Sequence, residues 1–201
     1  MGRPRAADHA DQRDRILLRA TEAIAELGYG SASMTQLAQA CGLSKAGLYH
    51  YFPSKDAILF ESLDRYTKLL MDRLAEVRAR GLEPRHELGE MVRTLMLQYR
   101  DSRAHHVALL NDVKSLEPAA REQIRAQERA VVDQLALTLE RVAPGRFDAL
   151  TRKPATMALL GMINFTFAWL RPDGPMSHEQ YAQLVIDLWE RGLGAEQAGS
   201  L

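Results

Sequence analysis

Apolar residues recur along most of the chain at the three- and four-residue spacing that marks one face of an α-helix. One such stripe consists of Ile16, Ala20, Ala23, Ile24 and Leu27. Another extends from Leu59 to Val77; with Lys55 before it and Gly81 after it, it predicts a helix of about 25 residues. No segment alternates apolar and polar residues as a half-buried strand does. The pattern therefore predicts an all-α protein of about nine helices.

Two short helices are expected between the first stripe and residue 55. Ser33, followed three residues later by Gln36, forms the S-x-x-Q capping box that begins a helix. Gly42 can adopt the left-handed conformation of a tight turn, and Ser44 then caps a helix over 45–51. A first helix followed by two short ones that a glycine turn joins is a helix-turn-helix, which places its last helix in the major groove of DNA.

Longer helices are expected in the rest of the chain. They begin after Pro84, near Arg103, after Pro118, at 147 or 152, and after Ser177. The run MALLGMINFTFAWL, 157–170, is apolar all round and is expected to be buried all round. It is also shorter than the ~20 residues that a membrane span needs. The last helix is expected to have an apolar side that faces inward, which consists of Tyr181, Leu184, Val185, Leu188 and Trp189.

Composition narrows the class of protein. The chain has 201 residues and a formal net charge of zero, so its overall charge indicates no partner. A single cysteine, Cys41, excludes an internal disulfide framework and a cysteine-based zinc cluster. The first residues contain no apolar signal sequence. These features fit a cytoplasmic protein.

Charge is distributed unevenly along the chain. No carboxylate occurs between Glu26 and Asp56, whereas Lys45, His50 and Lys55 do. A surface without acids is what a polyanion such as DNA requires, because a carboxylate would repel each phosphate that it faces. A small buried module that lacks acids by chance is the alternative.

The expected helix over 45–51, KAGLYHY, has the composition of a recognition helix. The small residues after Lys45 allow a close approach to the floor of the groove, where the lysine can reach a base edge or a phosphate. Leu48 and Phe52, four residues apart, are expected to hold the helix to its neighbours. Tyr49 and His50 then point outward, where a phenol and an imidazole can hydrogen-bond to phosphate oxygens.

Residues 28–59, GYGSASMTQLAQACGLSKAGLYHYFPSKDAIL, resemble the DNA-binding signature of the TetR family of transcriptional regulators. The resemblance implies a helix-turn-helix DNA-binding domain over 1–54 and a ligand-binding and dimerisation domain over 55–201. The positions that match the family's DNA contacts are Ser33, Thr35, Gln36, Ser44, Lys45, Ala46, Gly47, Tyr49, His50 and Lys55. Of these, 44–47 match the base-reading start of the recognition helix. Arg3 and Arg5 could enter the minor groove or belong to a disordered basic tail.

A second stretch, LLGMINFTFAWLRPDG, resembles a branch of the family that includes sensors of acyl-CoA thioesters, with Phe165 where tryptophan is common. An effector cavity is expected to be lined by Met71, Met96, Tyr99, Leu109, Leu110, Val113, Leu160, Ile163, Asn164 and Phe167. Candidates for the coenzyme A phosphates are Arg100, Arg103 and Arg171, with solvated surface arginines as the alternative. The amide of Asn164 needs a polar partner, either on the ligand or on a backbone carbonyl.

Other candidate sites have plainer alternatives. Cys41 could be a redox sensor or a small buried hydrophobe. His105 and His106 could begin a metal site, but adjacent helical positions point about 100° apart and no further ligand spacing accompanies them. One of the pair is expected to face the interior. No P-loop, G-x-S-x-G elbow or G-x-G-x-x-G occurs, so an enzyme would need an unmarked site.

The sequence thus predicts a homodimeric repressor, without cofactor or metal, that a small apolar effector releases from a pseudo-palindromic double-stranded operator. An acyl-CoA thioester is one effector class. Val185, Leu188 and Trp189, with part of 157–170, are expected between the subunits. A DNA-binding protein of the same fold without an effector is the alternative, and a helical enzyme is a remoter one. The effector, the operator, the regulated genes and the choice between repression and activation stay open.

Overall fold

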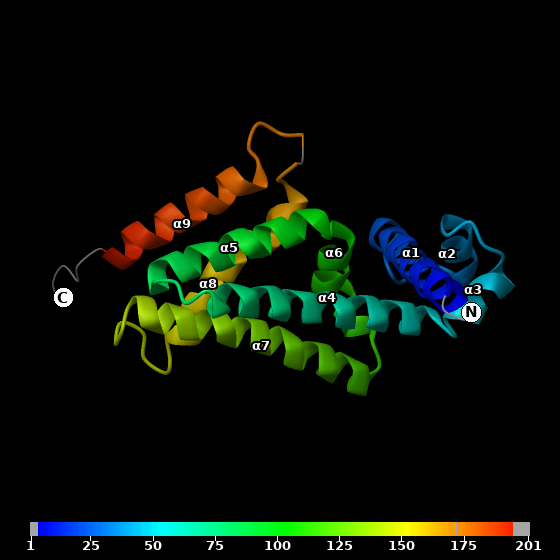
Figure 1. Ribbon diagram of the computed structural model, residues 1–201, viewed down its shortest axis with the longest axis horizontal. Helices are drawn as coiled ribbons and strands as arrows, with labels where there is room; N and C mark the ends of the chain where they lie inside the picture. The colour runs from blue at the N-terminus through cyan, green and yellow to red at the C-terminus, as the bar shows by residue number, and fades with distance from the viewer. Residues whose placement is uncertain (1–3, 172, 195–201) are drawn as a thin grey trace. The chain divides into compact units, whose positions relative to one another are not determined.

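The computed structural model describes residues 4–171 and 173–194. Within these residues the chain forms nine α-helices and two short 3-10 helices, and no strand (Figure 1). The elements are α1 (Pro4–Leu27), α2 (Met34–Ala40), α3 (Lys45–Tyr51), α4 (Lys55–Ala79), α5 (Pro84–Asp101), α6 (Arg103–Asp112), η1 (Val113–Ser115), α7 (Pro118–Val142), α8 (Arg152–Asn164), η2 (Phe165–Ala168) and α9 (His178–Gly194). The predicted all-α fold is confirmed.

Local signals set the ends of the first helices. Ser33 Oγ accepts from the Gln36 N–H at 3.3 Å and Gln36 Oε1 accepts from the Ser33 N–H at 3.0 Å, so the predicted capping box begins α2. Gly28 and Gly42, with φ of 78° and 68°, occupy the left-handed region where α1 and α2 end. Gly81 does the same after α4, whose 25 residues agree with the prediction.

α1 begins well ahead of the apolar stripe that starts at Ile16. Pro4 fits its first turn, because the N–H that proline lacks would have no intrahelical partner there. Of the predicted minor-groove arm, Arg3 lies outside the described residues, and so does the side chain of Arg5.

The chain folds into two compact units. The first consists of the residues up to Lys68 together with Ala104–Ala126, and the second consists of Leu69–Arg103 and the residues from Gln127 onward. α4 and α7 therefore contribute to both units. The predicted domains, 1–54 and 55–201, stay a prediction about function, since compactness groups helices without regard to what they bind.

In the second unit, α5 lies alongside α9, and both contact α8 (Figure 1). The second unit also buries a carboxylate, whose hydrogen-bond donors come from α7. Glu87 of α5 is 1% exposed, and its carboxylate accepts hydrogen bonds from Thr138 Oγ1 at 2.7 Å and Arg141 Nη1 at 2.9 Å. These donors compensate the burial of the carboxylate, which would be costly alone. No helix in the described residues is both long and apolar enough to cross a bilayer.

The run 157–170 differs from its prediction. α8 ends at Asn164 and the chain continues as η2, so the run is not one α-helix. It is not buried all round either, because Met157, Phe165 and Trp169 are 47%, 62% and 52% exposed. An apolar pattern marks side chains that avoid water, but it does not say whether the same chain or another covers them.

α9 also corrects the predicted burial. Leu184 and Leu188, expected to face inward, are exposed. Val185, expected between subunits, is completely buried within its own chain. Trp189 is half-buried and lines a small pocket with Leu159 and other residues of the second unit. The side of α9 that is available to a partner therefore carries Leu184 and Leu188, whereas Val185 belongs to the core.

Candidate nucleic-acid interface

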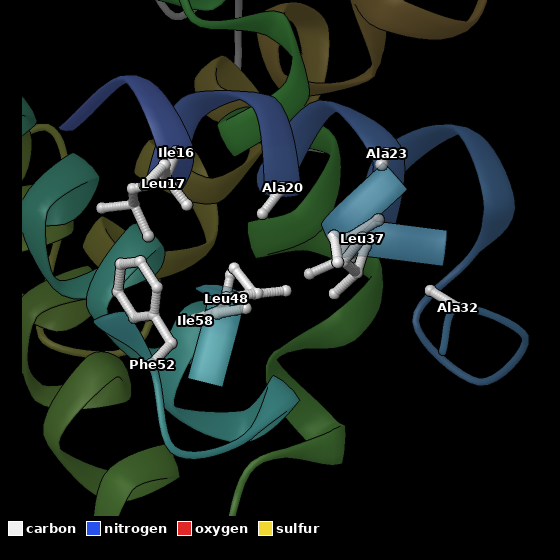
Figure 2. Packing of buried hydrophobic residues seen from close by; sticks show 11 residues of the cluster. Ile16, Leu17, Ala20, Ala23, Ala32, Leu37, Leu48, Phe52 and Ile58 are labelled. Atoms are coloured by element: carbon white, nitrogen blue, oxygen red, sulfur yellow. The ribbon is translucent and has the colours of Figure 1, made fainter. Parts of the chain in front are cut away.

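α3 is fixed on an apolar core that α1, α2 and the start of α4 complete. Leu48 and Phe52, four residues apart at the end of α3, are fully buried. Figure 2 shows them in one cluster with Leu17 of α1, Leu37 of α2 and Ile58 of α4. Burial of a side chain of this size contributes about 1.5–3 kcal/mol. The inner side of α3 is therefore held at two points one turn apart.

The start of α3 is small and cationic. Ser44 Oγ accepts a hydrogen bond from the Gly47 N–H at 3.0 Å and caps the helix. A Cβ on residue 47 would lie 3.2 Å from that oxygen, so glycine keeps the cap uncrowded. Lys45 and Ala46 are exposed beside it. A narrow helix start with one cation has the shape and charge that the major groove admits.

The other side of α3 carries the predicted phosphate contacts. Tyr49 is 45% exposed, and His50 next to it is exposed as well. Of the ten residues predicted to contact DNA, eight are exposed, and Gly47 and Lys55 are half-buried. Exposure is what a DNA contact requires; the contacts themselves stay predictions.

Lys55 has a second set of partners inside the protein. Its ammonium donates to the carbonyl oxygens of Tyr29 at 2.5 Å and Ala32 at 2.7 Å, and it lies 4.2 Å from the centre of the Tyr29 ring. These carbonyls belong to the turn that precedes the N-cap of α2. Lys55 therefore fixes the α1–α2 turn, whether or not it also contacts a phosphate.

Asp56, the first carboxylate after the acid-free segment, is engaged within the protein. Its Oδ1 accepts a hydrogen bond from the Tyr29 hydroxyl at 2.5 Å. Burial, and then this hydrogen bond, raise the pKa of the Tyr29 phenol, so it stays a neutral donor. The pairing directs this carboxylate toward Tyr29 and leaves the start of α4 dominated by Lys55.

Ion pairs that the sequence does not reveal join α1 to α4, and one of their arginines lies over Phe52 at the end of α3. The Arg13 guanidinium of α1 lies 4.5 Å from the centre of the Phe52 ring and also pairs with Glu61 of α4. Arg65 pairs with Glu61 at 2.7 Å and with Asp14 at 2.5 Å. Arg13 and Glu61 are 48 residues apart. No periodicity or motif links positions so far apart, which explains why sequence reasoning missed them.

The side chains of Cys41, His105 and His106 are engaged in contacts within the fold. The Cys41 thiol donates to the Ile16 carbonyl at 3.5 Å, and burial raises its pKa, which lowers its reactivity. His106 is 2% exposed and so faces the interior, as predicted for one of the pair, while His105 stacks on Tyr66 at 5.8 Å. In the part of the chain that the structure describes, no three His, Cys, Asp or Glu residues are placed to hold a metal ion.

The residues predicted to line an effector cavity fall in both units. Leu109, Leu110 and Val113 belong to the first, and the second contains Met71, Met96, Tyr99, Leu160, Ile163, Asn164 and Phe167. Two of them are bonded to each other, because the Tyr99 hydroxyl donates to Asn164 Oδ1 at 2.9 Å. Tyr99 is buried, which raises the pKa of its phenol. A side-chain hydroxyl, which the sequence reasoning did not consider, thus supplies a polar partner for Asn164.

A small pocket in the second unit joins several of the predicted effector residues. It is lined by Tyr99, Arg100, Arg103, Thr166, Phe167, Leu170 and His178. Arg100 pairs with Asp101 at 2.7 Å and with Glu179, and Arg103 donates to the Phe167 carbonyl at 3.2 Å. Two of the three predicted phosphate-binding arginines therefore stand beside Tyr99 and Phe167. The third, Arg171, is exposed.

Exposed apolar side chains gather on α8, η2 and α9. Met157 lies on α8 and Phe165 begins η2, and Leu184 and Leu188 lie four residues apart on one side of α9. α8 and α9 pack against each other. We call these four side chains, with the exposed Trp169, the C-terminal apolar face.

Two known families of protein domain match separate stretches of the chain. Residues 16–61 match the family described as bacterial regulatory proteins, tetR family, and residues 81–193 match the tetracyclin repressor-like C-terminal domain. PfmR, a TetR family transcriptional regulator from Thermus thermophilus, is 35% identical and superposes with a TM-score of 0.80. That similarity covers 90% of this chain and 100% of the PfmR chain.

Two further relatives differ in how much they share. AibR, whose structure contains isovaleryl coenzyme A and operator DNA, is 26% identical, with a TM-score of 0.79 over 88% of this chain and 97% of AibR. YuxN, an uncharacterized HTH-type transcriptional regulator of Bacillus subtilis (strain 168), is 32% identical over 89 residues, or 43% of this chain. The chain covers only 31% of the length of YuxN and 36% of the length of a second regulator of that strain.

Proposed function

Because the chain belongs to the TetR family of bacterial transcriptional regulators, we propose that it is a ligand-responsive repressor that binds an operator in the cytoplasm as a homodimer. The observation that carries the proposal is the two-sidedness of α3. Leu48 and Phe52 are fully buried, whereas Lys45, Tyr49 and His50 are exposed. A helix fixed on one side and cationic on the other can enter a groove without losing its place in the fold.

The exposed residues divide by the part of DNA that each would contact. Lys45 and the small residues after it would lie against base edges, which specify sequence. Tyr49 and His50, and the start of α2 with Thr35, would contact phosphates, which fix position and orientation without reading sequence. Binding by one α3 reads only a few base pairs, so an operator needs two copies of α3.

The C-terminal apolar face supports the homodimer. Five large apolar side chains on neighbouring elements, including Phe165 and Leu188, would be costly to leave in water. When two copies pair around a two-fold axis, the same face is buried twice by one contact. The operator would then be pseudo-palindromic, with half-sites about 34–36 Å apart or a multiple of that distance.

The effector class that we propose is an acyl-CoA thioester. AibR, 26% identical, was crystallised with isovaleryl coenzyme A. Here Arg100 and Arg103 flank the aromatic Tyr99 and Phe167 in one pocket, which suits an anion beside an apolar chain. An effector bound in the second unit would weaken DNA binding only if its affinity for the operator-free conformation exceeds its affinity for the DNA-bound one.

Retardation of the DNA upstream of the gene itself tests the proposal. The purified protein should retard this DNA, and micromolar acyl-CoA thioesters should release it, with free coenzyme A and the free acid much weaker. Retardation that no thioester or other apolar compound changes would favour the effector-free alternative. A protein that retards neither this DNA nor other duplexes would overturn the proposal.

A further inference from the structure

A cluster of three rings joins α1 to α3 next to the predicted phosphate contacts. The His9 ring of α1 stacks on Tyr51 of α3, with centroids 5.0 Å apart and an interplanar angle of 28°. His50 stands edge-on to both, 6.1 Å from His9 and 5.4 Å from Tyr51. Both imidazoles are exposed, and Tyr51 is half-buried between them and the core. The fold thus brings together two histidines that lie 41 positions apart in the sequence.

Among the side chains that the structure describes, few charges face this cluster. One turn further along α1, Arg13 lies over Phe52 and is paired with Glu61 of α4. On α3 the neighbours are Tyr49 and Tyr51, and no acid occurs between residues 26 and 56. Asp11 follows His9 by two positions on α1, and this spacing points it about 200° away from His9 around the helix.

Two imidazoles this close behave differently with and without an anion. When both are protonated, two positive rings whose centroids lie 6.1 Å apart repel each other even at the dielectric constant of water. A phosphate between them removes this repulsion and accepts a charge-assisted hydrogen bond from each ring. Histidine is the side chain whose charge ordinarily changes between pH 5 and 8, so phosphate binding and proton uptake are linked.

From this geometry, and on the premise that α3 binds DNA as proposed above, we infer that His9 and His50 form one site for a backbone phosphate. Tyr51 is the platform that holds His9 in place. The site takes up protons when it binds, so the affinity for DNA rises as pH falls from about 8 to about 5.5. His9 is thereby a DNA-contacting residue on α1, ahead of the stretch 28–59 that carries the family signature.

The test measures binding of a fluorescein-labelled duplex of arbitrary sequence at low, constant ionic strength, because phosphate contacts do not depend on base sequence. Wild-type affinity should rise about tenfold over this pH range. His9→Phe keeps the ring that stacks on Tyr51 but cannot take up a proton, so its pH dependence should fall by about half. The double variant with His50→Gln should show little pH dependence.

His86→Gln is the matched control, because His86 is exposed on α5 in the second unit. It should reproduce the wild-type profile. A wild-type protein that binds the duplex equally well at all pH values would overturn the inference and leave the proposed function intact. So would a His9→Phe variant with the wild-type slope, since the stack would then be structural only. Failure to bind any duplex at neutral pH would overturn both.

Discussion

Lys55 shows how one residue can serve both the fold and the site. Its ammonium is the donor for two carbonyls of the α1–α2 turn, those of Tyr29 and Ala32. Lys55→Met keeps the apolar stem and removes the donor. We expect it to lower the free energy of unfolding by about 1–3 kcal/mol, measured by urea denaturation.

Tyr49→Ala is the matched variant. Tyr49 is exposed, and its loss should leave the unfolding free energy nearly unchanged while weakening binding to all DNA sequences alike. Lys45→Ala should instead change the preference among sequences. If Lys55→Met were as stable as wild type, its contacts with the turn would be incidental, and the phosphate contact would be the better account of this lysine.

His105 is expected to make the fold sensitive to mild acid. Burial lowers the pKa of its imidazole, an effect that Glu22 opposes. The folded state therefore binds this proton less tightly than the unfolded chain. The stabilisation is full above the ordinary histidine pKa of about 6.5 and is lost as pH falls below it. The urea midpoint should drop between about pH 7.5 and about pH 5.5.

His105→Gln should reduce that pH dependence. It should not abolish it, because burial also lowers the pKa of His178. The exposed His86→Gln should leave the profile unchanged. Equal pH dependence in the wild type and the His105 variant would mean that the imidazole is protonated within the fold without penalty.

Residue-level features were predictable where their cause is local. The capping box of Ser33 and Gln36 and the Ser44 cap involve residues three apart, so the sequence alone revealed them. The stack of Arg13 on Phe52 and the His9–Tyr51 pair depend on how α1 crosses α3. A crossing angle is set by the whole core and leaves no mark at either position alone.

At the scale of elements, the α2–α3 turn is expected to be sensitive to a single methyl group. Gly42 has φ of 68°, and a Cβ there would meet no atom within 4 Å, so any penalty comes from backbone strain alone. Gly42→Ala should lower the unfolding free energy by about 1–2 kcal/mol and weaken DNA binding by displacing α3.

Gly30→Ala is the control in the neighbouring turn. Its Cβ would also meet open space, but its φ lies outside the left-handed region. That substitution should be neutral or slightly stabilising, because alanine restricts the unfolded chain. If thermal unfolding placed both variants at the same stability, the turn would tolerate a side chain at Gly42 and glycine would not be required there.

Helix ends were predictable and helix faces were less so. Gly28, Gly42 and Gly81 follow the ends of helices with positive φ, a conformation that glycine adopts without strain. This preference belongs to the single residue, so the sequence reveals it. The apolar residues of α8 and α9 obeyed helical periodicity, yet Leu184 and Leu188 lie outside the core. Periodicity shows that one face of a helix is apolar. It does not show whether the same chain or a second molecule covers that face.

At the scale of the whole molecule, the C-terminal apolar face should hold two chains together. Leu188→Glu places a charge on this face and should yield monomers, because an apolar interface cannot solvate an unpaired charge. Leu150→Glu is the control, since Leu150 is 80% exposed ahead of α8 and outside the face. Light scattering on both variants would measure the mass. A Leu188→Glu protein that remains a dimer with wild-type affinity would place the interface elsewhere.

Monomers made this way should also bind operator DNA more weakly by far than the dimer. Two recognition helices on one rigid dimer bind two half-sites with little further loss of freedom, whereas separate monomers lose it twice. Restoration of the dimer by a fused leucine zipper would not rescue binding unless it also restored the spacing of the two α3 helices.

Selection of binding sites from a pool of random duplexes tests the central claim, that paired α3 helices read DNA, most directly. The account predicts that the wild-type protein enriches an inverted repeat whose half-sites are about one helical turn, or a multiple of it, apart. Lys45→Ala should change the bases within each half-site and leave their spacing unchanged. Enrichment of no sequence, or of a motif without two-fold symmetry that Lys45→Ala leaves unaltered, would contradict the account.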